Sequence, residues 1–419
     1  MKRLIGLCAA ALFCSAALFA QEGLNFKLSG DVDARAGYAP ASTDSAFYGL
    51  APAAETAAGA YVDGKIVFSR QYTTLGLLDY TFEESNLLDH TNGASLESLS
   101  FTVNELYADL NWNDFLFLRL GKQRLKWGAG YVFNPSDPVN PPKNPTSLRA
   151  VREGVPAAKV EAIGGELALS VFAVLFDAID QTGVGAKISS SAIPGSDLAF
   201  SGYYSPSESW TAALNASITP FAALPGWDTI QLWFEGGIYD AARYAAVAAG
   251  PVPGAVVLGP PGGTSYNLLA GAQAELPVLR TILLTEYYHL SDGLDRGAIA
   301  AVYSALRSPD GAVVAASSAW YAELARRQAR VATDYLFASI SQPTITDGGN
   351  PVFDKIGLQA TCLVNLVDRS FFATGGITTA FVKDSEVDLT MTWAAGGAET
   401  EFGNLLSPVA ASLDAKVFF

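Results

Sequence analysis

The chain contains few of the residues that build disulfide frameworks and metal centres. Its 419 residues include three cysteines and two histidines. Cys8 and Cys14 lie near the start, so Cys362 is alone in the rest of the chain. This distribution excludes a small disulfide-stapled domain, and no Cys–His spacing typical of a metal site occurs. The catalytic patterns G-x-S-x-G and H-E-x-x-H are also missing. We expect no metal, no cofactor and no catalytic residue.

Long apolar runs are missing too. After residue 20 no stretch reaches the roughly 18 apolar residues that a membrane-spanning helix requires. The β–α alternation of a soluble α/β enzyme is absent, and a formal net charge of −15 argues against nucleic-acid binding. The hydrophobic content of 50% is therefore distributed over short segments.

Residues 1–20 have the pattern of a secretory signal peptide. Lys2 and Arg3 precede an apolar run over residues 4–19, and Ala20 ends it before polar residues. We predict cleavage after Ala20, which leaves 21–419 as a single domain. Loss of the two basic residues changes the charge of −15 to −17. The alternative, a lipoprotein anchored at Cys14, is disfavoured because bulky Phe13 precedes that cysteine.

The remaining chain consists of segments of about 8–12 residues in which apolar and polar side chains alternate. One segment opposes Leu106, Ala108, Leu110 and Trp112 to Glu105, Tyr107, Asp109 and Asn111. Another opposes Ile356, Leu358, Ala360, Cys362 and Val364 to Lys355, Gly357, Gln359, Thr361 and Asn365. A soluble β-sandwich also alternates, but its polar face is commonly rich in Lys and Glu. Here that face is mainly Ser, Thr, Asn, Gln, Gly and Tyr, which suits a narrow aqueous lumen.

These features predict an all-β, transmembrane, antiparallel up-and-down β-barrel of about 16–18 strands in the outer membrane, wide enough to enclose an aqueous channel. Short connections such as 111–114 and 276–278 read as periplasmic turns, and longer ones read as external loops. The long ones fall near 39–58, 84–98, 129–155, 240–262 and 292–330. Within the last, residues 317–330 are expected to form a short helix.

The final residues form an alternating strand that ends in phenylalanine. Leu413, Ala415, Val417 and Phe419 share one parity. This strand resembles the C-terminal signal of outer-membrane proteins, and the resemblance implies recognition by the barrel-assembly machinery.

Basic residues concentrate in the segment from Arg119 to Pro145. Up to Leu120 the even positions are apolar and face lipid, but Lys122, Arg124 and Lys126 cannot, because a charge at mid-membrane costs about 2–4 kcal/mol. We therefore predict a bulge at Gly121 that switches parity. The outward side chains beyond it would be Gln123, Leu125 and Trp127.

A stiff, Pro-rich loop follows, the third external loop by our count. Its position resembles that of the constriction loop of general porins, which folds into the barrel. The run GKQ…WG…NP.D is similar to a motif of several porin-like barrel families of Gram-negative type. The resemblance covers roughly residues 100–155 and implies an inward-folding loop.

The resulting hypothesis is a basic constriction of the lumen. Its basic members are Arg119, Lys122, Arg124, Lys126, Arg149 and Arg152, and Glu105 and Asp109 face them from the preceding strand. Opposed charges across a constriction would sort solutes by charge. In the alternative interpretation these charges pair with neighbours and only seal the wall.

We therefore expect a porin-like channel for passive diffusion of small hydrophilic solutes, contacting outer-membrane lipid and assembling as a homotrimer. One alternative is a plugged barrel that acts as a surface adhesin or polysaccharide anchor. A barrel-embedded hydrolase is disfavoured. Asp89–His90 resembles the pair of omptin-like proteases, but the further acidic partners of those enzymes have no match here. His289 with Ser291 resembles the dyad of outer-membrane phospholipase, but the order and the surroundings differ.

Overall fold

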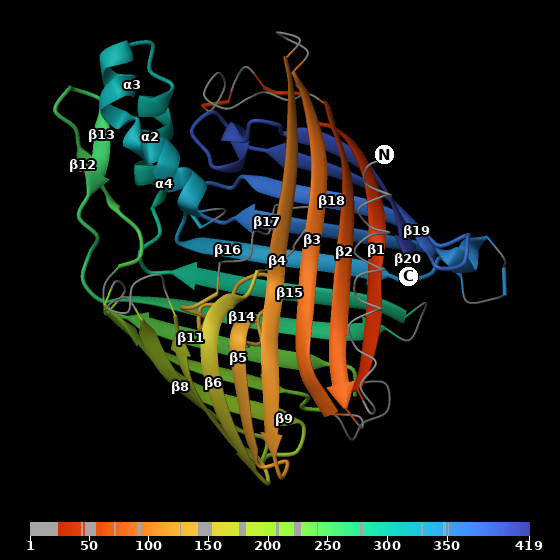
Figure 1. The fold of residues 1–419 in the computed structure, drawn as a ribbon. Helices are drawn as coiled ribbons and strands as arrows, with labels where there is room; N and C mark the ends of the chain where they lie inside the picture. Colours follow the sequence, from red (N-terminus) through yellow and green to blue (C-terminus); the bar gives the residue numbers. More distant parts are fainter. Residues whose placement is uncertain are drawn as a thin grey trace.

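A single 18-stranded antiparallel sheet dominates the computed structural model (Figure 1). The structure describes residues 24–42, 45–46, 56–70, 73–89, 94–125, 127–140, 153–175, 182–206, 209–221, 228–240, 242–276, 280–327, 330–346, 349–350 and 352–419. The first strands of the sheet are β1 (Leu24–Tyr38), β2 (Thr56–Arg70), β3 (Thr73–Asp89), β4 (Ala94–Trp112), β5 (Leu116–Gln123), β6 (Val155–Gly164), β7 (Leu167–Val174), β8 (Gly183–Ser190) and β9 (Ser196–Ser205). The others are β10 (Ser209–Ile218), β11 (Gln231–Tyr239), β14 (Ser265–Leu276), β15 (Thr281–Leu290), β16 (Asp334–Gln342), β17 (Ile356–Asn365), β18 (Phe371–Thr379), β19 (Ser385–Ala395) and β20 (Val409–Phe418).

The sheet closes on itself. Each strand pairs with its neighbours along the chain, and β1 pairs with β20 from Asp31↔Phe418 to Tyr38↔Ala411. Two backbone hydrogen bonds between Gly30 and Phe419, of 3.1 and 2.9 Å, end this seam. A closed sheet gives every strand a hydrogen-bonded neighbour on both sides. The predicted all-β barrel of 16–18 strands is confirmed at 18. No helix in the described part of the chain is long and apolar enough to cross a membrane.

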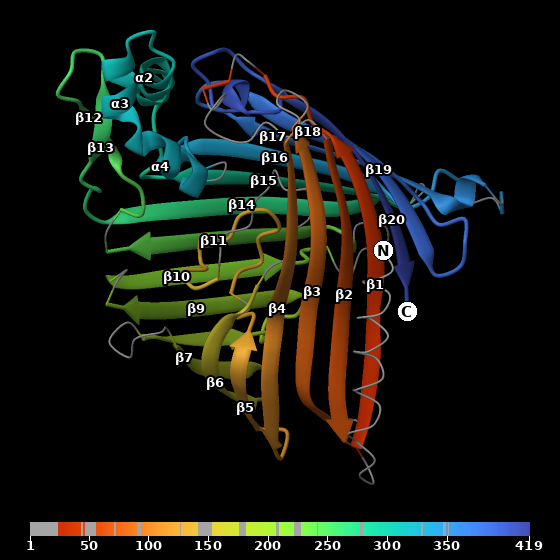
Figure 2. The same cartoon turned by 45° about the horizontal axis from the view of Figure 1, so that its top comes forward.

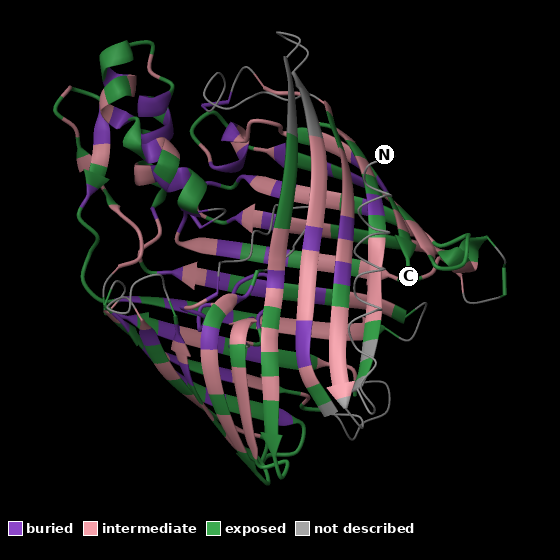
Figure 3. Cartoon of the chain, viewed as in Figure 1, coloured by how far each residue is buried: buried purple, intermediate pink, exposed green. Residues whose placement is uncertain are grey.

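Buried and exposed residues alternate along the strands (Figure 3), and many of the exposed ones are large apolar residues. On β11, Leu232, Phe234 and Ile238 are 40, 42 and 48% exposed, whereas Trp233 and Glu235, which face the lumen, are 7 and 0% exposed. A water-soluble protein buries the first set rather than the second. This reversal is the pattern of a barrel surrounded by lipid.

The external loops carry additional structure. The β15–β16 connection holds helices α2 (Arg296–Leu306), α3 (Gly311–Ser317) and α4 (Ala319–Arg327), and a hairpin of β12 (Ala246–Ala249) and β13 (Val256–Gly259) lies beside them (Figure 1). We call these helices and this hairpin the cap. The predicted helix over 317–330 corresponds to α4, whereas α2 was not predicted. The prediction of a long loop at 84–98 is wrong, because β3 continues to Asp89 and β4 begins at Ala94.

The hydrophobic core lies inside the barrel and under the cap. Ile299, Val302 and Trp320 of the helices are fully buried and belong to one cluster with lumen-facing residues of the wall, including Leu269 and Tyr335. The cap is therefore packed onto the external end of the β11–β19 wall. Two short 3-10 helices, η3 (Phe353–Lys355) and η4 (Phe402–Asn404), complete the connections.

The C-terminal parity leads to a prediction on assembly. Leu413, Val417 and Phe419 are 49, 57 and 50% exposed, and Ala415 shares their outward face. Phe419→Ala keeps both backbone bonds to Gly30, so we expect the purified variant to refold normally in detergent. In cells it is expected to accumulate at several-fold lower levels in the outer membrane, because the substitution alters the predicted assembly signal.

Phe418→Ala is the matched control, since Phe418 is similarly exposed but lies on the other parity. Heat-modifiable gel migration and outer-membrane yield are the measurements. Equal yields for the two variants would contradict the prediction that Phe419 belongs to an assembly signal.

Candidate functional site

The loop between β5 and β6 crosses the lumen and is held by two buried glutamates of the opposite wall. Glu235 of β11 and Glu286 of β15 are both 0% exposed. Each accepts hydrogen bonds from backbone amides of residues 130–136. In Figure 2 this gold-coloured segment runs inside the ring, toward β11 and β14. The predicted inward fold of the third external loop is confirmed.

Glu235 requires glycine in the loop. Its carboxylate accepts from Gly130 N and, at 2.8 Å, from Ser136 Oγ. A Cβ at Gly128 would lie 2.1 Å from Glu235 Oε1, and one at Gly130 would lie 1.9 Å from the carbonyl oxygen of Phe133. The Trp-Gly-Ala-Gly sequence therefore permits a backbone approach that any larger residue would block.

Glu286 binds the next turn of the loop. Its two oxygens accept from Tyr131 N, at 2.5 Å, and from Val132 N, at 2.7 Å. Trp233 Nε1 of the wall donates to the same carboxylate at 3.0 Å. Hydrogen bonds to a charged acceptor are stronger than neutral ones, and they compensate a carboxylate that has left water.

Apolar contacts fix the loop on both sides of these carboxylates. Phe133 stacks on Tyr288 with ring centroids 4.3 Å apart and an interplanar angle of 13°. Nearer to β5, Trp127 packs edge-on against Phe172 at 5.1 Å, in a cluster with Leu125 and Tyr203. The loop thus lies on the lumen faces of β6–β9 at its start and of β11–β16 further along.

The predicted parity switch at Gly121 is wrong. The register of β5 with β4 and β6 runs unbroken through this residue, although its φ is +130°. Gln123, Leu125 and Trp127, expected to face lipid, are 1, 6 and 6% exposed and lie inside. The alternation failed as a guide because β5 ends at Gln123, where the chain turns into the lumen.

The bulge lies instead on the neighbouring strand. The β3–β4 register shifts between Asp79↔Glu105 and Tyr80↔Val103, which leaves Asn104 as the extra residue of β4. Asn104 is 2% exposed, and its amide donates to Asp79 Oδ1 at 3.0 Å and to Thr81 Oγ1 at 2.9 Å. The extra residue switches the parity of β4, which allows Glu105 and Asp109 to face the lumen.

The described basic residues of the hypothesis are ion-paired. Arg119 donates to both oxygens of Asp109, at 2.6 and 2.8 Å, and lies 3.8 Å from the Tyr107 ring centroid. Arg124 lies 3.7 Å from carboxylate oxygens of both Asp79 and Glu105.

Lys122 is not on the lumen parity. It pairs in register with Leu106, which is 53% exposed on the outer face, and its ammonium donates to Glu153 at 2.8 Å. Lys126, Arg149 and Arg152 lie outside the described residues.

The same charged lining continues onto the strands at the seam. Arg35 of β1 bonds Asp414 of β20, and Lys416 lies 2.8 Å from Asp388 and 3.5 Å from Glu386 on β19. Side chains of this lining remain partly exposed, with Arg124 at 37%, Arg119 at 30% and Lys416 at 27%. Since they face the barrel interior, this exposed surface shows space for water beside the β19–β5 wall.

A buried carboxyl joins the external loops at the mouth. Glu401, in the β19–β20 loop, accepts from Tyr335 Oη at 2.6 Å and from Asn365 Nδ2 at 2.9 Å. Its backbone N donates to Asp368 at 2.7 Å. Burial raises the pKa of Glu401 to about 7, and the negative charge of Asp368 adds to the increase.

The described residues do not support the protease-like pair or the phospholipase-like pair as a catalytic site. His90 lies outside the described residues, and the described parts contain no group of three or more metal-ligating side chains. His289 Nδ1 lies 2.9 Å from Asp334 Oδ1, while Ser291 Oγ accepts from the backbone N of Tyr266. His289 therefore lies in the outward aromatic region, with its ring 5.7 Å from that of Tyr266.

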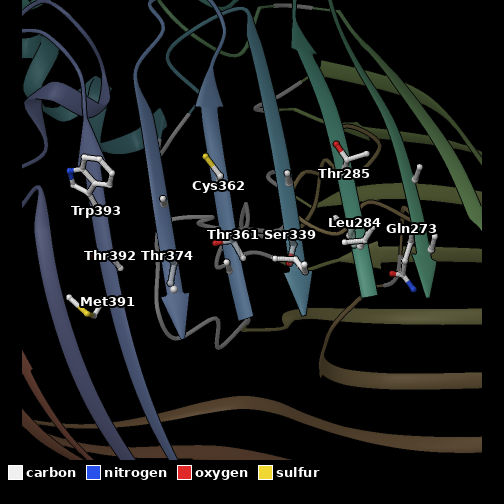
Figure 4. A pocket seen from close by; sticks show the side chains of 18 of the residues that line it. Gln273, Leu284, Thr285, Ser339, Thr361, Cys362, Thr374, Met391, Thr392 and Trp393 are labelled. Atoms are coloured by element: carbon white, nitrogen blue, oxygen red, sulfur yellow. The ribbon is translucent and has the colours of Figure 1, made fainter. Parts of the chain in front are cut away.

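A cavity of about 990 Å³ lies on the outer face rather than in the lumen (Figure 4). It is lined mainly by small outward side chains of β14–β19, such as Ala338, Ala360 and Ala373, with Met391 and Trp393 beside them. Cys362 is among these lining residues, which agrees with its predicted lipid-facing parity. The cavity is a depression in the lipid-facing surface.

Comparison with known proteins identifies the fold. No family model and no curated sequence matches the chain. The chain is similar to Pseudomonas aeruginosa OccK5 (OpdH), with a TM-score of 0.50, 7% identity and coverage of 94% of this chain and 98% of that one. A variant of OccD1 (OprD) has a TM-score of 0.50 at 9% identity, with 96 and 97% covered. This chain thus has the fold of an outer-membrane porin-like β-barrel, as the GKQ…WG…NP.D resemblance implied.

The loop anchors give a prediction on stability. Glu286→Ala leaves the amides of Tyr131 and Val132 and the indole of Trp233 without their acceptor. Because a buried donor without a partner costs about 1–3 kcal/mol, we expect a loss of several kcal/mol and faster proteolysis of the loop. Limited proteolysis of the refolded barrel measures this, with exposed Glu166→Ala as control. Equal cleavage rates would refute the anchor.

Glu401 predicts the pH dependence of stability. With a folded pKa of about 7 and an unfolded pKa near 4.5, the folded state binds more protons between these values. Stability therefore falls as the pH rises from about 4.5 to 7, by at most about 1.4 kcal/mol per pH unit. Thermal denaturation in detergent should show a smaller decline for Glu401→Gln, whereas surface Glu399→Gln should keep it. A wild-type melting temperature that does not fall across this window would contradict the assignment.

Proposed function

We propose that the protein is an outer-membrane channel for passive diffusion of small hydrophilic solutes. The observation that carries this proposal is the water-accessible charged wall of β19, β20 and β1–β5, where lumen-facing side chains stay partly exposed. The inward loop packs against the other walls, over β6–β9 and β11–β16. Solutes pass between the loop and the charged wall.

The loop and this wall form the constriction. Arg119 and Arg124 contribute to it as members of ion pairs with Asp109, Asp79 and Glu105 rather than as a purely basic ladder. Alternating charges of both signs order water and discriminate between solutes by their charge. No enzymatic step is involved.

A second candidate is a capped barrel with a binding role at the cell surface, as an adhesin or polysaccharide anchor. The cap supports it, since α2–α4 share one hydrophobic cluster with the lumen wall. In that case the cap would be the binding surface and the lumen would not conduct. Conductance therefore separates the two candidates.

Three further expectations remain predictions: cleavage of the signal peptide after Ala20, insertion by the barrel-assembly machinery, and association into a homotrimer. The depression on the outer face is a place where a neighbouring barrel or lipid would contact the wall.

The proposed role of the loop predicts an effect on conductance. Gly130→Ala prevents the loop from seating on Glu235, so the constriction widens. In planar bilayers we expect discrete conductance steps for the wild type and steps at least twofold larger for the variant.

Gly263→Ala is the matched control, because a Cβ there meets nothing within 4 Å. Identical step sizes for all three proteins would show that the loop does not limit the passage. A folded wild type without any steps would favour the capped barrel.

A further inference from the structure

Pairs of carboxylates oppose each other directly on the lumen face. Asp31 of β1 is the register partner of Asp63 on β2, and Asp79 of β3 is the partner of Glu105 on β4. Asp388 of β19 is the partner of Asp414 on β20. One neighbour from each pair confirms the orientation, since Val32, Leu106 and Leu389 are 39, 53 and 44% exposed on the outer face. All three pairs therefore lie on the wall that lines the proposed passage.

Such pairs cost stability. Directly opposed residues of antiparallel strands have Cβ atoms about 4.5–5.5 Å apart, and like charges at this separation repel. Basic side chains reduce the repulsion at the Asp79–Glu105 and Asp388–Asp414 pairs. Arg124 lies between Asp79 and Glu105, while Arg35 contacts Asp414 and Lys416 contacts Asp388. The repeated arrangement favours positive charge at three places along one wall.

Carboxylates also outnumber basic groups over the whole charged wall. The comparison covers the described lumen-facing residues of β19, β20 and β1–β5, and Arg124, which follows β5. The acidic residues are Glu386, Asp388, Asp414, Asp31, Asp33, Asp63, Asp79, Glu83, Glu105 and Asp109. The basic residues are Lys416, Lys27, Arg35, Lys65, Arg119 and Arg124. An excess of one sign in a narrow passage with low-dielectric walls raises the local concentration of ions of the opposite sign.

We propose that the passage selects cations and cationic solutes, such as small molecules with an ammonium or guanidinium group. This inference rests on the proposed channel function and names its substrate class. A permeating cation interacts successively with the opposed carboxylates and offsets their repulsion, as acidic rings do in cation channels. Arg124 limits the selectivity, because it occupies the position between Asp79 and Glu105 that a permeating cation would take.

The reversal potential of the refolded protein in a planar bilayer under a potassium chloride gradient tests the proposal. We expect a potassium-to-chloride permeability ratio above 1. Neutralising one pair, Asp31→Asn with Asp63→Asn, should lower the ratio at least twofold, whereas Arg124→Gln should raise it. Replacing potassium by lysine as the cation should still give a cation-driven potential.

The control neutralises two carboxylates away from the passage, Glu166→Gln with Asp384→Asn, which lie in turns outside the strands. It should leave the ratio unchanged. Heat-modifiable migration verifies that each variant is folded. An open channel with a ratio at or below 1, or one in which both double variants act alike, overturns the selectivity alone. A folded wild type without conductance overturns the proposed function and the selectivity with it.

Discussion

Every backbone N–H and C=O of a strand in lipid must find a partner, because the bilayer core offers no water to replace it. This constraint explains the closed sheet, the outward apolar side chains and the seam at which β1 meets β20. It also determines where polar chemistry can reside. Because the outer face is apolar, charged side chains can only line the lumen or lie in the loops. Along each strand, apolar and polar residues therefore alternate with a period of two.

Backbone groups inside the lumen also need hydrogen-bond partners. The loop between β5 and β6 brings unpaired backbone amides into the interior, where they need acceptors. Glu235 and Glu286 supply these acceptors, and the amides in turn compensate two carboxylates that have lost water. The loop and the wall therefore depend on each other. The glycines at 128 and 130 matter because backbone and carboxylate must approach more closely than a side chain permits.

The interior consists of two regions that differ in polarity and in access to water. One holds the loop and the cap through aromatic and aliphatic contacts and buried hydrogen bonds. The other, from β19 through β20 to β5, carries charges of both signs that remain accessible to water. A passage along the second region is wetted by charged groups, and the sign of their excess decides which solutes it favours. The excess of negative charge is clearest at the opposed carboxylate pairs.

The sequence alone determined the class of fold, because period-two alternation, the absence of long apolar runs and the C-terminal pattern are properties of the local chain. It also predicted an inward third loop, from the resemblance of residues 100–155 to porin-like barrels. The tertiary structure decided which residues meet. Alternation could not place Trp127 inside, since it stops being informative where β5 ends, nor could it distinguish a bulge at Asn104 from one at Gly121. Glu235 and Glu286 appear in the sequence only as acidic residues on a lumen parity, and only the register and the path of the loop bring them to the amides they bind.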